Sequence, residues 1–564
     1  MLDVGCSRLP ASMPELPPYD PYPGKPAFFD KNPGLVWASA VFGLTAVLTV
    51  LMFPPYTTPE FAYAFAVPAL FWAYERPRFK PYALTLFAAQ AVAWTILLGW
   101  LHHVTWLGLF LLGPFMGAWT GLWYLGAWWV LPRMRGRQAL MRLLAMLGLG
   151  GWWVLIEWSR TWFLGGFPWL PLAASQWQRS AVLQIAAWTG AWGVSFILIV
   201  FNLGFAAYFH RALRDGLPSL RRRPPEFLLA LIILMFGTIL PLSDTFHREL
   251  YVRPLASVAM VQPDIPQTIK WDPASAPAIL GVLEKSTLEV AAVYPDVILW
   301  PEATTPLPLR GDGQMQAWVE SLARRAHTPL VLGTIAVEHA NQPGEAWYNA
   351  ACVVDPSAGL QPVYYAKRKL VPFGEYVPLR PLLGWLKKIV PIGDDDDARG
   401  HAAQPLAVSL NDRVLTLGPL ICYEDVFPNL ARDNALAGVD TLVVLTNNAW
   451  FGEGGAAYQH AAHSVLRAVE TRRPVLRCGN AGWSGWIDEF GNVRAVLTND
   501  DGSIYFRGSR GMEVTRDARW IDRQSYYVQH GDWFIGWCAV LALLGFAAVS
   551  IGRPPAPPAS ADEV

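Results

Sequence analysis

The sequence predicts two structural units: an α-helical membrane bundle of about eight helices and an α/β domain inserted before the last helix. Three observations carry this prediction. Apolar residues make up 53% of the 564 residues and charged residues only 16%, whereas soluble proteins carry about 25% charged residues. Seven of eight apolar runs lie before residue 246. The region 246–530 instead alternates β-branched runs with helix-like stretches, as layered α/β domains do.

The candidate spans are apolar runs, most of which approach the roughly 20 residues needed to cross a bilayer. They lie near 35–53, 61–74, 81–101, 105–131, 139–157, 181–209, 227–243 and 533–550. The second run is short and contains Pro68, so it is the weakest candidate. Buried core helices are the other interpretation, which the density of runs in the first part of the chain disfavours. The Pro-rich segment 1–30 predicts a disordered tail without a cleavable signal peptide.

Basic residues are concentrated in alternate loops of the predicted bundle. The loops after spans two, four and six carry them: Arg76, Arg78, Lys80; Arg133, Arg135, Arg137; Arg211, Arg214, Arg221, Arg222 and Arg223. The positive-inside rule places these loops in the cytoplasm. We therefore expect seven spans in 31–245, an extracytoplasmic domain in 246–530, an eighth span in 531–552 and a cytoplasmic tail in 553–564.

The region 246–530 contains seven short strand-like runs separated by helix-like stretches. The strands are expected at 256–261, 296–300, 329–335, 347–354, 414–421, 441–446 and 475–477, and helices at 273–293, 314–326 and 460–472. No Gly-rich phosphate loop and no Cys or His cluster with zinc spacing is present, so we expect no nucleotide cofactor and no metal. The formal net charge of zero argues against nucleic acid as a partner.

Three residues at the ends of strand-like runs form the candidate catalytic centre. Glu302 ends the segment Ile-Leu-Trp-Pro-Glu, Lys367 follows Tyr-Ala, and Cys422 follows Leu-Ile. A cysteine is nucleophilic only as a thiolate, so it needs a base or positive charge nearby. A glutamate can move the thiol proton, and a lysine can stabilise a developing oxyanion. Acid, amine and thiol together support covalent acyl transfer.

Each of these residues also has a simpler interpretation. A lone cysteine is usually a buried core residue, and Lys367 adjoins Arg368 and Lys369, as a surface lysine would. Cys478 is a rival nucleophile, but it lacks a flanking glutamate. Pairing of Cys352 with Cys478 remains open from the sequence. The three residues in this order favour catalysis more strongly than any one of them.

The motifs around these residues resemble those of the apolipoprotein N-acyltransferases, membrane members of the nitrilase (carbon–nitrogen hydrolase) superfamily. The matching segments are 166–169, 175–176, 190–196, 261–262, 270–271, 300–302, 367–378, 421–424, 449–452 and 467–473, with Asn480 and Gly482. The resemblance implies an αββα sandwich and assigns Glu302 as base, Lys367 as oxyanion stabiliser and Cys422 as nucleophile. It adds Glu375 and Glu424 as essential acids, and Trp271, Tyr423, Trp450 and Glu470 around the entrance of the active site.

The resemblance also implies a reaction, its partners and a location. Cys422 would take an acyl chain from a membrane phospholipid as a thioester and pass it to the α-amino group of the diacylglyceryl-cysteine of an apolipoprotein. The enzyme would lie in the bacterial inner membrane, with its catalytic domain in the periplasm.

Two other functional classes remain open. One is a membrane-tethered nitrilase-type amidase that uses water as acceptor. The other is a transporter or scaffold with a decayed hydrolase domain, which the intact triad and the scarcity of ionisable residues within the spans disfavour. Glu157 and Arg160, three residues apart near the end of the fifth span, are expected to form a structural pair.

Overall fold

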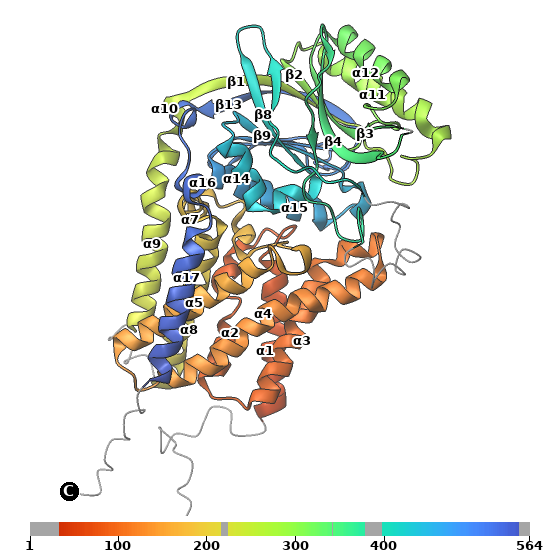
Figure 1. Cartoon of the computed structure of the whole chain (residues 1–564). Helices are drawn as coiled ribbons and strands as arrows, with labels where there is room; N and C mark the ends of the chain where they lie inside the picture. The colour runs from red at the N-terminus through yellow and green to blue at the C-terminus, as the bar shows by residue number, and fades with distance from the viewer. Residues whose placement is uncertain (1–32, 216–223, 341, 378–396, 552–564) are drawn as a thin grey trace, which may run out of the picture.

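The computed structural model describes residues 33–215, 224–340, 342–377 and 397–551. The predicted tails at 1–30 and 553–564 and the cluster Arg221–Arg223 lie outside the described residues. Figure 1 shows a bundle of helices at one end of the molecule and an α/β domain at the other.

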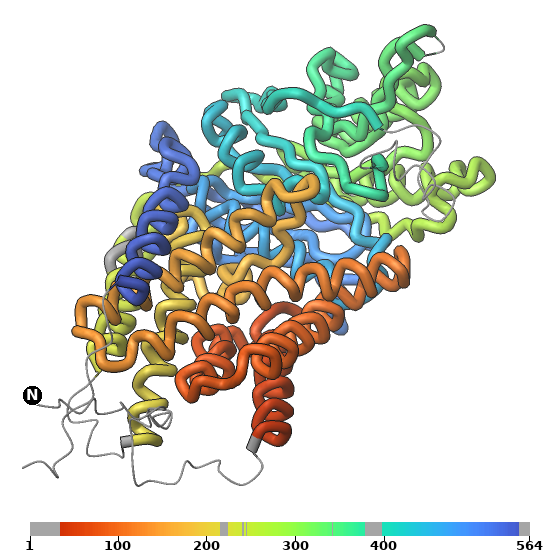
Figure 2. The backbone as a smooth tube through the Cα atoms, turned by 60° about the horizontal axis from the view of Figure 1, so that its bottom comes forward, coloured from red at the N-terminus to blue at the C-terminus, as the bar shows by residue number. Residues whose placement is uncertain are grey.

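The bundle is built from long apolar helices. They are α1 (Pro33–Leu51), α3 (Phe79–Leu97), α4 (Trp106–Met134), α5 (Ala139–Ser159), α8 (Ala191–Asp215), α9 (Pro225–Phe246) and α17 (Trp533–Ser550). By length and composition, five of the described helices could cross a membrane: α1, α4, α5, α8 and α17. The last helix, α17, packs on α5 although the whole α/β domain separates them in sequence (Figures 1 and 2). A Cβ on Gly148 would lie 2.7 Å from the Cα of Gly545, so glycine permits this close approach.

The second predicted span is not a full-length helix. It consists of the 3-10 turn η1 (Pro59–Tyr63) and the helix α2 (Val67–Tyr74), whose eight residues extend only about 12 Å. The segment still joins the two ends of the bundle. Gln176 Nε2 donates to the carbonyl of Pro59 at 2.9 Å at one end, and Arg135 donates to the carbonyl of Tyr74 at the other.

The sixth predicted span begins later than its apolar run. Residues 180–189 form two short helices, α6 (Ser180–Leu183) and α7 (Ala186–Thr189), and the long helix α8 starts at Ala191. Gly190 separates them with φ of +69°, a left-handed conformation that favours glycine. The apolar run therefore contains a break that hydrophobicity alone does not reveal.

The Arg-rich loops meet at the end of the bundle that is remote from the α/β domain. Arg135 and Arg214 both pair with Glu75. Arg142 pairs with Glu226 at 2.6 Å, and Arg137 donates to the carbonyl of Ile551 at the end of α17. The loops that the sequence marks as Arg-rich therefore lie together at one end of the bundle.

Two mixed sheets form the centre of the α/β domain. The first has strand order β13-β1-β2-β3-β4-β5, with β6 also pairing with β4, and the second has order β12-β11-β10-β9-β8-β7. The strands of the first are β1 (Val252–Gln262), β2 (Val297–Trp300), β3 (Leu330–Glu338), β4 (Ala346–Asp355), β5 (Gly359–Leu360), β6 (Tyr365–Ala366) and β13 (Gly508–Asp517). Those of the second are β7 (Leu406–Ser409), β8 (Val414–Ile421), β9 (Thr441–Thr446), β10 (Val475–Gly479), β11 (Gly485–Ile487) and β12 (Val493–Val496).

Helices cover the outer face of each sheet. The inner faces share one apolar cluster, in which Val258 and Leu299 of the first sheet join Leu417 and Leu445 of the second. Helices α11 (Ala276–Ala291) and α12 (Gly313–Ala326) pack on the first sheet. Helices α14 (Pro428–Leu436) and α15 (Gly455–Thr471) pack on the second and on the bundle, because their apolar residues belong to the same cluster as the bundle core. The predicted αββα sandwich is confirmed, and its α15 layer rests on the membrane helices (Figure 1).

Candidate active site

Glu302 lies two residues after the end of the buried strand β2, at the carboxyl end of the parallel pair β1–β2. Its side chain is buried, and Oε1 accepts hydrogen bonds from Asn349 Nδ2 at 2.8 Å and Lys367 Nζ at 3.2 Å. Its main-chain oxygen accepts from Lys270 Nζ at 3.2 Å. Burial alone would raise the pKa of Glu302, but Lys367, Lys270 and Asn349 hold that pKa below its usual value. Glu302 is therefore an ionised carboxylate, ready to accept a proton.

Lys367 follows the short strand β6 and is fully buried. Its ammonium contacts two carboxylates: Glu302 at 3.2 Å and Glu375 at 2.6 Å. Burial opposes the charged form, but these two acids together raise the pKa of Lys367 well above its ordinary value. Glu375 is held in turn by the main-chain amide of Val371, which donates to Oε2 at 2.9 Å. A charged lysine thus faces the carboxylate of Glu302.

Cys422 stands at the sharp turn between strand β8 and the 3-10 turn η8 (Cys422–Val426). Its φ of +50° is rare for a residue with a side chain and costs on the order of 1–3 kcal/mol. Burial raises the pKa of its thiol to about 12, with Glu302 adding to the rise and Lys367 opposing it. The resting group is therefore a neutral thiol whose pKa is affected by both Glu302 and Lys367. Its conversion to a thiolate therefore requires a group that accepts the proton.

Glu424 joins the cysteine turn to the lysine segment. Its Oε2 accepts from Tyr365 OH at 2.7 Å and from the amide of Ile421 at 2.8 Å. Its Oε1 accepts from the amides of Arg368 at 2.6 Å and Lys369 at 3.0 Å. Burial raises the pKa of this carboxyl, and the hydrogen bonds from Ile421, Tyr365 and Arg368 oppose that rise together with the charge of Lys367. The side chain fixes the residues before Cys422 relative to those after Lys367.

A second buried network lies behind the cysteine turn. His460 Nε2, on α15, lies 3.1 Å from the carbonyl of Cys422 and 2.8 Å from Asp425 Oδ1. The other ring nitrogen, Nδ1, lies 3.2 Å from Asn448 Oδ1, so both nitrogens of His460 face oxygen atoms. Asp425 Oδ2 also accepts hydrogen bonds from Arg477 Nη1 at 2.7 Å and Ser464 Oγ at 2.6 Å. These contacts anchor the strained turn to α15 and β10.

The cysteine turn is also held by the bundle. Tyr423 OH donates to the carbonyl of Gly166 at 2.8 Å, and the Tyr423 ring stacks on Phe167, with the centroids 6.1 Å apart. Gly166 belongs to the loop after α5, which Glu157 and Arg160 support. Glu157 Oε1 accepts from the amide of Leu172 at 2.6 Å, and Arg160 donates to the carbonyl of Trp169 at 3.3 Å.

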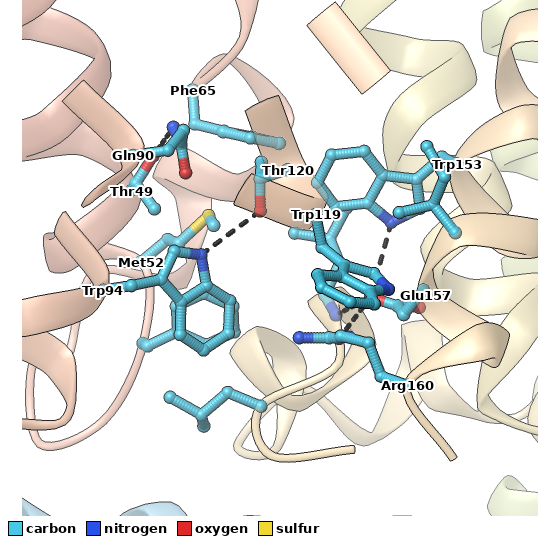
Figure 3. Close-up of a pocket in the computed structure, with 14 residues that line it drawn as sticks. Thr49, Met52, Phe65, Gln90, Trp94, Trp119, Thr120, Trp153, Glu157 and Arg160 are labelled. Atoms are coloured by element: carbon cyan, nitrogen blue, oxygen red, sulfur yellow. Dashed lines mark hydrogen bonds and ion pairs between the residues drawn. The ribbon is translucent and has the colours of Figure 1, made fainter. Parts of the chain in front are cut away.

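Glu157 and Arg160 border a small cavity of about 20 Å³ inside the bundle (Figure 3). Their side chains pair at 3.5 Å, which confirms the expected structural pair. Across the cavity, Trp94 Nε1 donates to Thr120 Oγ1 at 3.2 Å. The volume accommodates about one water molecule, so this cavity is too small for a lipid or peptide.

Two family models match this chain. The carbon–nitrogen hydrolase model matches residues 257–514, and the model of the apolipoprotein N-acyltransferase N-terminal domain matches residues 45–204. The apolipoprotein N-acyltransferase of Geobacter metallireducens is 32% identical over 414 residues, which cover 71% of this chain and 74% of that protein. The chain belongs to the apolipoprotein N-acyltransferase family. The predicted resemblance is confirmed.

A second apolipoprotein N-acyltransferase shows the same likeness. The apolipoprotein N-acyltransferase of Azotobacter vinelandii is 34% identical over 377 residues, covering 66% of this chain and 69% of that protein. Among solved structures, an amidase of the nitrilase superfamily from Nesterenkonia AN1 aligns at 17% identity with a TM-score of 0.35. That alignment covers 50% of this chain and 97% of the amidase.

The remaining predicted site residues of this family member occupy different surroundings. Trp271 and Trp450 are 50% and 41% exposed, unusually open for tryptophan. Glu470 is buried at the end of α15, where Oε1 accepts from the amide of Ala191 at 2.8 Å and Oε2 pairs with Arg467 at 2.7 Å. These contacts place Glu470 at the start of α8, where it joins the sandwich to the bundle.

Cys478, the rival nucleophile, and Cys352 lie in apolar surroundings. Cys478 is fully buried between the two sheets, where its Sγ donates to the carbonyls of Leu299 at 3.4 Å and Val261 at 3.5 Å. Burial raises its pKa well above the ordinary value, and burial likewise raises the pKa of Cys352 to about 12. Both thiols are free, so Cys352 and Cys478 do not form the disulfide that the sequence left open.

Three further residues lie near the centre; the sequence predicted no site role for Asn349 or His460, and it gave Lys270 only as part of the matching segment 270–271. Asn349 is a polar residue in the apolar strand β4, Lys270 precedes an exposed tryptophan, and His460 is on a buried helix face. A buried polar side chain within an apolar strand is the signal that could have identified Asn349. Among the residues that the structure describes, no three His, Cys, Asp or Glu side chains cluster in a way that could hold a metal ion.

Proposed function

We propose that this chain transfers an acyl chain from a membrane phospholipid to the α-amino group of the diacylglyceryl-cysteine of an apolipoprotein. One observation carries the proposal: Glu302 and Lys367 pair at 3.2 Å beside a strained, buried Cys422 whose turn is bonded to a bundle loop. A covalent acyl-transfer centre is thereby fixed to the membrane-embedded part of the chain. The family membership agrees with this reaction.

In the first half-reaction, the Cys422 thiol gives its proton to Glu302 as Sγ attacks the ester carbonyl of the phospholipid. A C–S bond forms, and the carbonyl oxygen takes the negative charge. Lys367 faces that charge, together with the amide of Tyr423, because the first amides of a helical turn have no partner within the turn. The C–O bond then breaks, and Glu302 returns the proton to the leaving lysophospholipid oxygen.

In the second half-reaction, the neutral α-amino group of the apolipoprotein cysteine attacks the thioester. Glu302 takes a proton from the attacking nitrogen, the C–S bond breaks, and the proton returns to the Cys422 sulfur. An amide replaces the thioester and the enzyme is regenerated. The mechanism needs no cofactor, because Glu302, Lys367 and Cys422 supply every proton and charge that the two steps require.

The arrangement of the domains suits substrates that are anchored in a lipid layer. The α15 layer of the sandwich rests on the bundle, and the exposed rings of Trp271 and Trp450 could contact acyl chains at the entrance. The positive-inside rule then assigns the Arg-rich end of the bundle to the cytoplasm and the α/β domain to the periplasm of the bacterial inner membrane. The units we propose are a bundle in 31–245, a catalytic domain in 246–530 and a last span in 531–552.

A single-turnover experiment separates acyl transfer from hydrolysis. The purified full chain is first charged with radiolabelled phospholipid, and the acyl-enzyme is then mixed with a peptide bearing an N-terminal diacylglyceryl-cysteine. We expect the peptide to discharge the enzyme much faster than water does, and the label to move to the peptide. An identical peptide with an acetylated amino group is the matched control. Equal discharge by the blocked peptide would establish water as the acceptor and favour the amidase alternative.

The orientation is tested with reporter fusions. A reporter that is active only outside the cytoplasm should be active when fused after Glu338 and silent when fused after Arg135. The opposite pattern would place the catalytic domain in the cytoplasm, away from the proposed substrates.

A further inference from the structure

A second hollow, the arginine pocket, lies apart from the catalytic centre. Its volume is about 300 Å³, within the range of small-molecule sites. Three arginines and three aromatic residues dominate its wall: Arg472, Arg519, Arg523, Trp188, Trp520 and Tyr526. Arg472 follows the end of α15, about 18 Å along the helix from His460. The pocket therefore belongs to a different part of the domain from Cys422.

The pocket concentrates positive charge, although Arg472 is buried and its Nη1 already donates to Gln184 Oε1 at 2.7 Å and to the carbonyl of Glu489 at 3.0 Å. No acidic residue is among the described residues that line it, although Asp517 pairs with Arg519 from outside at 2.5 Å. The guanidinium of Arg523 lies 5.5 Å from the ring centroid of Trp520. The indole Nε1 of Trp520 is buried and has no acceptor in the part of the chain that the structure describes. A ligand with anionic oxygens satisfies both this donor and the exposed Arg523.

The pocket opens at the level where two helices enter the bundle. Trp533 is the first residue of α17, and its indole N–H donates to the carbonyl of Trp188 at 2.8 Å. Trp188 lies three residues before Ala191, where α8 begins. The rings of Trp188 and Tyr526 stack with centroids 5.6 Å apart, and they are 54% and 38% exposed. Exposed aromatic rings at the end of a membrane bundle are typical of the lipid–water interface. At that depth, the abundant anionic oxygens are those of phospholipid phosphates.

We propose that the arginine pocket binds the phosphate of an anionic phospholipid in the leaflet that faces the α/β domain. Arg523 and the Trp520 indole N–H contact the phosphate oxygens, and the rings of Trp188 and Tyr526 pack against the upper part of the acyl chains. Basic pockets between helix ends recognise head groups in this way. This lipid is retained by the protein, and it is distinct from the acyl donor that reaches Cys422.

The test uses the full chain in nanodiscs that contain equimolar phosphatidylglycerol and phosphatidylcholine. Native mass spectrometry counts the lipids that stay bound after the disc is removed. Every variant carries Cys422→Ala, so that no lipid is held as a thioester. We expect one phosphatidylglycerol to be retained in preference to phosphatidylcholine. Arg523→Gln should lower its occupancy about fivefold, the effect of one basic side chain near an anionic lipid.

Two further variants keep the test independent of folding. Trp520→Phe removes the indole N–H but keeps a ring, and it should also lower the retention of phosphatidylglycerol. Arg253→Gln is the matched control, since Arg253 is exposed on the same domain outside the pocket, and it should retain the lipid as before. Unchanged retention in Arg523→Gln, or equal retention of the two lipids, would overturn the proposal. Complete displacement by soluble glycerol phosphate would also overturn it, because the pocket would then be a site for free phosphate esters.

Discussion

Replacing Glu424 by glutamine tests whether the cysteine turn and the lysine segment are held in register by one carboxylate. The carboxylate accepts two hydrogen bonds at each oxygen, three of them from main-chain amides. A glutamine amide offers only one acceptor oxygen. The less costly orientation turns its NH₂ toward Tyr365, whose hydroxyl can rotate and accept, but it then also faces the amide of Ile421. At least one buried donor loses its acceptor.

The magnitude follows from that count. A buried donor without an acceptor costs about 1–3 kcal/mol, and the bonds to Arg368 and Lys369 also lose their charge assistance. We therefore expect Glu424→Gln to lower the free energy of unfolding by about 2 kcal/mol and the thermal midpoint by a few degrees. A displacement of about 1 Å at a reacting atom can cost about 100-fold in rate, so acyl-enzyme formation should fall by about that factor.

The assay is single-turnover formation of the acyl-enzyme, measured beside a thermal unfolding curve. Glu513→Gln is the matched control, because Glu513 is exposed on β13 of the same domain and should change neither quantity. A wild-type acylation rate in Glu424→Gln would refute the inference that this side chain fixes the register of the site.

Three other predictions concern the catalytic groups. Glu302→Gln should slow acyl-enzyme formation about 10²–10⁴-fold and Lys367→Met about 10²–10³-fold, with the double variant far less impaired than the product; multiplicative losses in single-turnover assays would show that they act separately. Burial lowers the pKa of Lys270 to about 8, so acyl-enzyme formation should fall as the pH rises through that value and Lys270 loses its charge. Lys270→Arg should remove this fall, and an unchanged pH profile in that variant would exclude Lys270 as its origin. Tyr423→Phe loses the bond to Gly166 and should lower the free energy of unfolding by about 1 kcal/mol; an unchanged thermal midpoint would show that this bond does not join the domains.

The fold was predictable where the chemistry is local. Runs of β-branched residues located all seven expected strands, and the alternation of Arg-rich loops located one end of the bundle. Hydrophobicity was insufficient where the chain bends within an apolar run. Pro68 lies in the short helix α2, and Gly190 breaks the predicted sixth span before α8. The shortness of the second run and Pro68 had marked it as the weakest span, whereas the break at Gly190 leaves the polarity of the sequence unchanged and is revealed only by the backbone conformation.

The sequence predicted only those site residues that belong to a short continuous motif. Glu302, Lys367 and Cys422 each lie within two residues of the end of a strand, and the structure brings Glu302 and Lys367 into contact beside the cysteine. The partner Asn349 comes from another segment and has no motif of its own, and the matching segment 270–271 gave no indication that Lys270 contacts Glu302. Their contribution depends on the pairing of strands and on burial, which the sequence does not display.

The central claim is that Cys422 carries the acyl chain. Its most direct test is the intact mass of the full chain after incubation with phospholipid and without an acceptor, for the wild type and Cys422→Ala. The wild type should gain the mass of one acyl chain, and neutral hydroxylamine should release it, as expected for a thioester. Cys422→Ala should gain nothing, while Cys478→Ala should behave as the wild type. Acylation of Cys422→Ala together with its loss in Cys478→Ala would contradict the account.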